Sequence, residues 1–509
     1  MLNALRVLIL TLLFAGCTKN IDYQTLTITY SADIRGFDPA FATDLRTGKV
    51  VSLLYDNLVR FDLDMNLVPG AAKRWSVSAD GRKYTFIIRN NIRFHNGDLL
   101  TVDDIIVSFE RILNPQTISP QSWLLDRISG AKDYLQGDTD HVKGLTAIND
   151  STVVIKLDVP FSPFIQYLAM PATAIININE MKHLSKIPAG SGPWKLDEWE
   201  RDGEILFTRN DDYWEGSPKI EHLRIRILSE IMTQSAEFEA GTLDIYEVPH
   251  GELEYWRNKN YNKKEVNELN IWYVGMNCSR PPFNNVYLRK AMNYAIDREK
   301  IIHILLNGSA TLATGSLPPQ LLAEQPKVYY DYNPRRAIEL LKKAGHENGL
   351  KTELVVAGGS EMFHVLEALQ SDWAAVGINV EIKRSDWNVF KTAVREGKPD
   401  LYYLDWYADY PDGENFLYPL FHSKESMTKR NRFSDPDVDA IIEKIQQLPN
   451  NTKRQSLIVE ANNMIADKAP WVFLWHTKTT YLTQNWIGGF SPSPIFNAQR
   501  YIYVTKEIS

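Results

Sequence analysis

The chain has 509 residues, too many for one hydrophobic core, so its length predicts two or more lobes of about 100–200 residues each. Hydrophobic residues make up 44% of the chain and charged residues 23%, which is the composition of an ordinary globular protein. The formal charge of -7 lacks the basic excess of a nucleic-acid binder, so nucleic acid is excluded as a partner class.

The N-terminus has the features of an export signal. Arg6 precedes an apolar run over residues 7–14, which is too short to span a bilayer but suits a secretory signal. Ala15 and Gly16, followed by Cys17, look like the bacterial lipobox, in which the cysteine becomes the lipidated first residue. A plain cleaved signal with a chance cysteine is the alternative. We expect residues 1–16 to be removed and the mature chain to lie in the periplasm or on the outer face of the cell membrane, anchored through Cys17.

The first half of the chain mixes short strands, turns and helices. Apolar alternation over 25–30 predicts a strand, and residues 50–61 have the apolar spacing of a helix. Thr101 and the two aspartates after it predict a capped helix start, and Asn114-Pro115 stops that helix. Further strands are predicted at 84–89, 223–228 and 244–246, with a hairpin over 191–210.

In the second half, helices and strands alternate in β-α-β order, which indicates an α/β lobe. Helices are predicted at 289–304, 334–344, 362–376, 438–448 and 453–467, and strands at 271–277, 354–357, 378–382 and 471–475. Because no flexible linker separates the lobes, we expect strands to join them as a hinge.

One stretch, residues 404–413, combines acidic and aromatic side chains at a strand end. The apolar run 401–404 stops at Asp405, and Pro411 and Gly413 then break the backbone. A carboxylate between indole and phenol rings can hold a cationic group out of water. The alternative is an ordinary strand that leaves a core through a solvated turn.

Motifs for catalysis are absent from the sequence. The ten His show no metal-ligand spacing, and no nucleophile elbow, P-loop or dinucleotide fingerprint occurs. We therefore expect no enzyme activity, no metal and no cofactor.

Many short segments of the mature chain match one known family, in the same order. The most specific lie between 72 and 115 and include Trp75, Asp80-Gly81, Tyr84-Thr85-Phe86, Phe94-His95-Asn96-Gly97-Asp98 and Ser108-Phe109-Glu110-Arg111. Later ones include Gly192-Pro193-Trp194, Asp212-Tyr213-Trp214, Pro281-Pro282-Phe283-Asn284 and Ala295-Ile296-Asp297-Arg298. Together they resemble the extracellular solute-binding proteins of family five, the oligopeptide- and dipeptide-binding receptors of ABC importers.

The resemblance implies an α/β fold of the two-lobed periplasmic-binding-protein type, class II, with an extra subdomain and a hinged ligand cleft. Lobe I would comprise residues 17–50, 186–265 and 481–509, its subdomain 51–185, and lobe II 266–480. The implied partners are a peptide ligand and the permease subunits of an ABC transporter, and the implied state is a monomer.

The resemblance also places a candidate site. Asp409, in Trp406-Tyr407-Ala408-Asp409-Tyr410, would hold the ammonium group of a peptide. Backbone around Asp405 to Tyr407, and around Thr43, Asp44 and Leu45 in the other lobe, would pair with the ligand as an added strand. The candidates for side-chain pocket walls are Trp387, Trp406 and Trp123, each with a core-only role as the alternative.

The sequence departs from the family where relatives carry an Arg for the ligand carboxylate. One such position falls at Ser360-Glu361 and another at Tyr403, with Arg395 or Lys391 as candidate substitutes. A ligand of fixed dipeptide length is therefore disfavoured, and longer peptides fit better.

The leading hypothesis is an extracytoplasmic receptor that delivers oligopeptides to an ABC import permease. A receptor for a specialised ligand, such as a signalling or cell-wall peptide or a metal chelate, is the second hypothesis. An extracytoplasmic chaperone or enzyme is the third, and it has no motif in its support.

Overall fold

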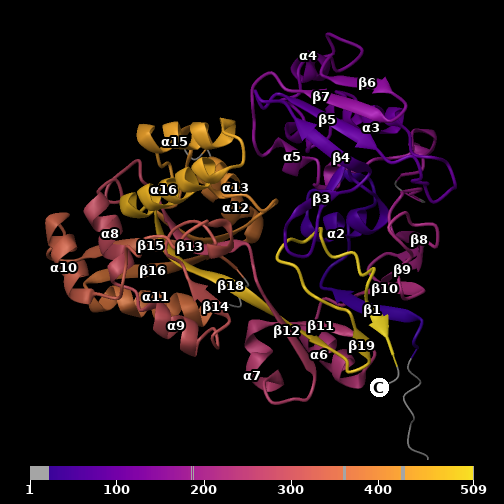
Figure 1. Ribbon diagram of the computed structural model, residues 1–509. Coiled ribbons are helices and arrows are strands. Elements are labelled where there is room, and N and C mark those ends of the chain that lie inside the picture. Colours follow the sequence, from indigo (N-terminus) through magenta and orange to yellow (C-terminus); the bar gives the residue numbers. More distant parts are fainter. Residues whose placement is uncertain (1–21, 185, 187, 359–362, 426–429, 508–509) are drawn as a thin grey trace, which may run out of the picture.

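The computed structural model describes residues 22–184, 186, 188–358, 363–425 and 430–507. The predicted export signal, Cys17, Ser360 and Glu361 lie outside these residues. The fold is mixed α/β, and Figure 1 shows two bodies next to one another: lobe I, mostly indigo to magenta with the yellow C-terminal segment, and lobe II, pink through orange to yellow. Within the described ranges, no helix combines the length and the apolar composition needed to cross a bilayer.

The central sheet of lobe I has the order β1-β10-β9-β8. Its strands are β1 (Thr25–Tyr30), β8 (Trp194–Glu200), β9 (Glu204–Arg209) and β10 (His222–Ile227), and only the β1–β10 pair is parallel. The helix α2 (Leu45–Leu54) packs its apolar face on this sheet, where Leu26, Leu54 and Trp194 are fully buried. Near the C-terminus, β19 (Ile487–Gly488) and β20 (Thr505–Lys506) pair beside the same core.

A second antiparallel sheet, with the order β4-β5-β7-β6, forms the upper part of lobe I in Figure 1. The capping box predicted at Thr101 is present, since Thr101 and Asp104 each accept the backbone N–H of the other. The elements of this part are β2 (Val59–Phe61), β3 (Leu67–Pro69), β4 (Ala72–Val77), β5 (Lys83–Ile88), β6 (Leu145–Asn149), β7 (Thr152–Lys156), α3 (Val102–Leu113), α4 (Ala131–Gln136) and α5 (Phe164–Tyr167).

A mixed sheet with the order β11-β18-β13-β17-β15-β16 forms the centre of lobe II, and its edge strand β11 belongs to the residues assigned to lobe I. Its strands are β11 (Ile245–Val248), β13 (Asn270–Met276), β15 (Leu350–Ala357), β16 (Ile378–Ser385), β17 (Leu401–Tyr407) and β18 (Trp471–Thr483). The helices are α8 (Val286–Tyr294), α9 (Arg298–Ile304), α10 (Pro334–Lys343), α11 (Phe363–Ala375), α12 (Trp387–Arg395), α13 (Glu414–Phe421), α15 (Pro436–Gln447) and α16 (Thr452–Lys468).

Helices cover both faces of β17, because its side chains alternate between two apolar clusters. Leu401 and Tyr403 are buried in one cluster with α8, α10 and α11, and Tyr402 is buried in the other with α12, α13, α15 and α16.

Strands connect the two lobes. The long strand β18 pairs with β13 at its start and with β11 and β12 (Asn262–Asn267) at its end, and it also pairs with β14 (Ala310–Leu312). Figure 1 shows β18 running from the lobe II sheet down to β11 and β19, beside α6 (Ile231–Ala240) and α7 (Leu253–Trp256). The prediction for 471–475 therefore located this strand but missed more than half of its length.

Two predicted helices have other bounds. The helix expected over 289–304 is two helices, because the Asp297 carboxylate accepts the backbone N–H of Lys300 and starts α9 afresh. The helix expected over 50–61 ends at Leu54, and residues 59–61 form β2 instead.

Candidate ligand-binding site

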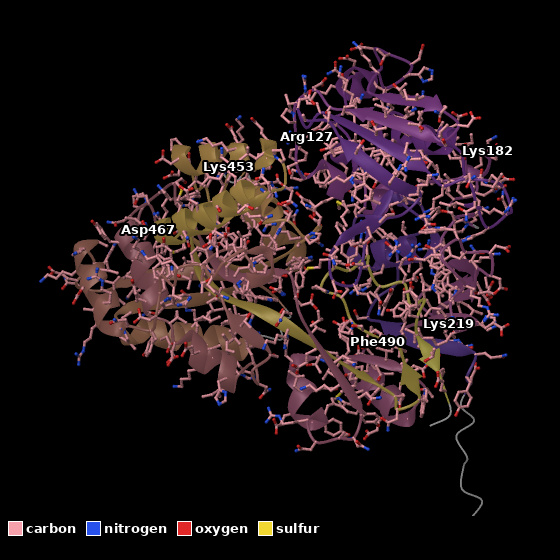
Figure 2. All side chains as sticks on the ribbon, viewed as in Figure 1. Arg127, Lys182, Lys219, Lys453, Asp467 and Phe490 are labelled. Carbon is pink, nitrogen blue, oxygen red and sulfur yellow. The ribbon has the colours of Figure 1, made fainter. Side chains whose placement is uncertain are left out.

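A cavity of about 250 Å³ lies between the two lobes. From lobe I it is lined by the end of β1, by Leu45 and Lys49 of α2, and by the C-terminal segment 490–501. Leu269, Tyr407 and Ala408 line it from the other side, where β13 and β17 meet. Phe490, labelled in Figure 2, belongs to the C-terminal segment of this lining. The cavity thus brings together three of the predicted site residues, Leu45, Tyr407 and Ala408.

The end of β17 fixes the backbone beside this cavity. Tyr407 pairs with Asn270 of β13, and the Ala408 N–H donates to the Leu269 carbonyl at 2.8 Å. The next N–H, that of Asp409, donates to Asn415 Oδ1 at 2.9 Å, which turns the chain into α13. Asp409 therefore stands at a strand end whose backbone is held by two short hydrogen bonds.

Asp409 is partly buried, and burial raises the pKa of its carboxyl above the ordinary value, while a hydrogen bond with Asn415 opposes that shift. Among the described residues, none forms an ion pair with Asp409. A desolvated carboxylate without a cationic neighbour favours the arrival of a cation from a ligand.

An aromatic contact across the lobes adjoins Asp409. The Tyr410 and Tyr167 rings meet edge to face at 5.1 Å between centroids, and their hydroxyl oxygens lie 3.3 Å apart. The Trp123 ring packs on the other side of Tyr167 at 5.2 Å, and it is 40% exposed. The predicted residues Trp123 and Tyr410 thus belong to one aromatic row that joins lobe I to lobe II.

Polar contacts extend this junction. Gln166 Nε2 donates to Asp412 Oδ2 at 2.7 Å, and the Ser162 N–H donates to the Gln446 carbonyl at 2.7 Å. Asp412 in turn receives two hydrogen bonds from the buried Arg454, at 2.8 and 2.9 Å.

Residues 43–45 contribute their backbone and one side chain to the candidate site. The Asp44 carboxylate caps α2 by accepting the Thr47 N–H at 3.0 Å, and it faces Arg35 Nε at 3.4 Å. Thr43 accepts a hydrogen bond from Arg35 at 3.3 Å. Because these side chains are engaged locally, only Leu45, which is 44% exposed, presents its side chain to the cavity.

Trp387 and Arg395 lie on α12 and do not line the interlobe cavity. Trp387 is 47% exposed and stacks on Phe390, and Arg395 lines a separate hollow with Leu404 and Arg430. Trp406 donates its indole N–H to the Asn415 carbonyl at 3.1 Å, and Arg430 lies over its ring at 5.0 Å. Asp405 is desolvated, which raises the pKa of its carboxyl, and the charge of Arg430 opposes this rise.

Most residues of the cavity lining were missed by sequence reasoning, among them Lys49, Glu268 and Phe496. Lys49 lies 5.8 Å from the Tyr30 ring, and its charge acts to lower the pKa of the Glu268 carboxyl. Glu268, between β12 and β13, has the pKa of its carboxyl raised to about 7, mainly by burial. Phe496 comes from the C-terminal segment. None of the three stands in a recognisable motif, and the helical spacing of α2 was the only available signal for Lys49.

The chain matches known proteins over nearly its whole length. A heme-binding protein A of Haemophilus influenzae is 27% identical over 87% of this chain and 85% of its own. The dipeptide-binding protein of Escherichia coli is 26% identical over 96% of this chain and 95% of its own. The structure of HbpA2 from Haemophilus parasuis superimposes with a TM-score of 0.84 at 26% identity, covering 95% of this chain and all of that one.

Residues 66–428 match the model of bacterial extracellular solute-binding proteins, family 5 middle. The match covers well over half of the chain, and the fold described above is that of periplasmic binding proteins. The chain therefore belongs to family 5 of the bacterial extracellular solute-binding proteins, and it is a solute-binding protein of ABC import and not an enzyme.

Proposed function

We propose that the protein captures oligopeptides in the cleft between its lobes and delivers them to an ABC import permease. The observation that carries the proposal is Asp409, a desolvated carboxylate without an ionic partner among the described residues, at the end of the strand beside the interlobe cavity. A peptide ammonium placed there would form a charge-assisted hydrogen bond, and the β17 backbone would pair with the ligand main chain.

Calorimetry with matched peptides tests this function. Asp409→Asn removes the charge but keeps the shape of the side chain, so we expect at least a tenfold loss of affinity for peptides with a free N-terminus. The same peptides with an acetylated N-terminus would bind both proteins equally weakly. Asp331→Asn, at an exposed position in lobe II, is the control. Equal affinity of free and acetylated peptides for the unmodified protein would remove Asp409 as the anchor.

A specialised ligand is the second candidate, and the heme-binding relative from Haemophilus influenzae favours it, because heme is a metal chelate. Native mass spectrometry of the freshly purified protein separates the two candidates. A series of masses that correspond to mixed peptides supports the oligopeptide receptor. A single non-peptide mass supports the specialised receptor.

The remaining parts of the proposal concern the location of the protein in the cell and the division of its chain into lobes. We propose that residues 1–16 are removed and that a lipid on Cys17 anchors the mature monomer outside the cytoplasm. The proposed parts are lobe I (17–50, 186–265 and 481–509), its subdomain (51–185) and lobe II (266–480). Incorporation of labelled fatty acid, and its loss in Cys17→Ser, tests the anchor.

A further inference from the structure

The interlobe cavity carries more negative than positive charge in its lining. Its carboxylates are Glu247 of β11 and Glu268, which lies between β12 and β13, and its one cation among the described residues is Lys49 of α2. With both carboxylates ionised, two negative charges face one positive charge, so one negative charge is left uncompensated. A ligand that brings one cationic group into the cavity balances that charge.

Strand register places both carboxylates at the same wall of the cavity. Glu247 pairs with Tyr481 of β18, so the two side chains lie on one face of the sheet, and the Tyr481 hydroxyl donates to the Glu247 carboxylate at 3.3 Å. Thr479, two residues earlier on β18, shares that face and hydrogen-bonds to Glu268. Figure 1 shows β11 and β12 beside the end of β18, which brings these residues together.

Neither carboxylate forms an ion pair within the described part of the chain. Glu247 accepts the bond from Tyr481 and is exposed, whereas Glu268 is largely desolvated. Burial raises the pKa of the Glu268 carboxyl to about 7, and the charge of Glu247 adds to this rise, while Thr479 and the charge of Lys49 oppose it. The two carboxylates thus repel one another, and a cation placed beside them relieves that repulsion.

Aromatic rings form much of the remaining wall. They belong to Tyr30, Tyr407, Tyr481, Tyr501, Phe490 and Phe496. The face of such a ring attracts a cation, and a planar guanidinium also stacks on it. The cavity of about 250 Å³ has room for one long side chain. Carboxylates and ring faces together suit the side chain of arginine or lysine better than an apolar or an acidic one.

One hydrogen bond connects this cavity to the proposed anchor of the ligand. The Ala408 N–H donates to the Leu269 carbonyl at 2.8 Å. Glu268 precedes Leu269 and Asp409 follows Ala408, so the two carboxylates stand on either side of this bond. A peptide whose ammonium group is held by Asp409 therefore has its first two side chains nearest to Glu268.

We propose that the interlobe cavity selects peptides with arginine or lysine at one of their first two positions, and that Glu268 and Glu247 determine this preference. The proposal rests on the proposed function, because it takes Asp409 as the anchor. It goes beyond that function, since backbone pairing along β17 is indifferent to the side chains of the ligand. Lys49 has the opposite effect, because its positive charge repels that of the ligand side chain.

Peptides with arginine or citrulline test the preference, because citrulline replaces the guanidinium by a neutral urea of nearly the same shape. Calorimetry on the full mature protein would compare alanine-based pentapeptides that carry one or the other residue at position 1, 2 or 4. We expect arginine to bind about ten times more tightly than citrulline at position 1 or 2, and the position 4 pair to bind alike.

Charge variants assign the preference to the cavity. Glu268→Gln and Glu247→Gln should each lower the ratio of arginine to citrulline affinity to about one third or less of its value, and Lys49→Met should raise it about threefold. A role in packing alone would change both affinities and leave their ratio as it is. Glu324→Gln, at an exposed position in lobe II, is the control and should leave the ratio unchanged.

The outcomes separate this proposal from the proposed function. If peptides bind through Asp409 but arginine and citrulline bind alike at positions 1 and 2, or their ratio is the same in every cavity variant, the preference is wrong and the proposed function stands. If no peptide binds the unmodified protein, both are wrong. Glu247→Gln alters an exposed side chain, so it and Lys49→Met decide the matter if Glu268→Gln does not fold.

Discussion

Tyr410 of lobe II and Tyr167 of lobe I lie edge to face, with ring centroids 5.1 Å apart and hydroxyl oxygens 3.3 Å apart. This contact is adjacent to Asp409 in sequence, so the proposed anchor of the ligand and the junction of the lobes share one short loop. A change at the junction is therefore expected to alter ligand affinity, even where the changed side chain touches no ligand.

Gln166→Ala should weaken ligand binding by about tenfold, because it removes the hydrogen bond to Asp412 that joins the lobes beside the site. The variant should unfold at nearly the same denaturant concentration as the unmodified protein, since Asp412 keeps both bonds from Arg454. Calorimetry and small-angle scattering with and without ligand measure the effect. Gln116→Ala, at an exposed position of the same lobe, is the control, and equal losses in both variants would contradict the prediction.

Arg454→Met should destabilise lobe II by about 3–5 kcal/mol, because it leaves the Asp412 carboxylate buried without its countercharge. Arg336→Met removes an arginine from an exposed pair with Glu339 and should cost under about 1 kcal/mol. Denaturant unfolding followed by tryptophan fluorescence gives both values. Similar losses of stability in the two variants would show that the buried ion pair contributes no more to stability than the exposed one.

Peptide affinity should fall as the pH is lowered through the raised pKa of Asp409. Burial favours the neutral acid, and only the charged carboxylate holds an ammonium group, so binding at acidic pH releases a proton from Asp409. Calorimetry in two buffers of different ionisation enthalpy measures that proton. The release should vanish in Asp409→Asn, and a release that persists there would assign the proton to another group.

Glu268 should make the protein less stable as the pH rises. The pKa of its carboxyl is about 7 in the folded state, against an ordinary value of 4.5, so the folded state holds the proton more tightly than the unfolded state does. Between pH 4.5 and pH 7 the free energy of unfolding should therefore decrease with pH, by about 3 kcal/mol at most.

Glu268→Gln should remove this decrease, because an amide does not titrate. Denaturant unfolding at pH 5 and pH 8 compares the two proteins, with Glu324→Gln, at an exposed position, as the control. If the unmodified protein and Glu268→Gln lose the same stability between these pH values, the effect belongs to other groups.

Much of the fold could be predicted from the sequence where local patterns are strong. The alternation in β1, the Thr101 capping box and the α15 and α16 helices follow from short-range rules, and the structure has them within a few residues of their predicted bounds. The length of β18 could not be predicted, because the polar residues 477–480 interrupt its apolar run. Thr477 pairs with β14 and residues 478–480 pair with β12, and Thr477 and Thr480 are buried there, which is a tertiary effect.

The residues of the candidate site were likewise predictable only where the signal is local in the sequence. Asp409 and its aromatic neighbours were noticed because they are contiguous in the sequence. Lys49 and Glu268 come from separate parts of the chain and meet at the interlobe cavity only when the chain is folded. The same limit applies to Trp387 and Arg395, which lie on α12 and do not line the interlobe cavity.

The pairing of β18 with β12 and β13 has a consequence for the energetics of capture. The connection between the lobes is already a hydrogen-bonded ribbon, so a change in the angle between the lobes is taken up by twisting that ribbon. No loop has to become ordered in the connection when a ligand arrives, and the conformational entropy lost there is small. The binding free energy then reflects mainly the contacts with the ligand, because little of it is lost in ordering the connection. This suits a receptor that must also release its ligand.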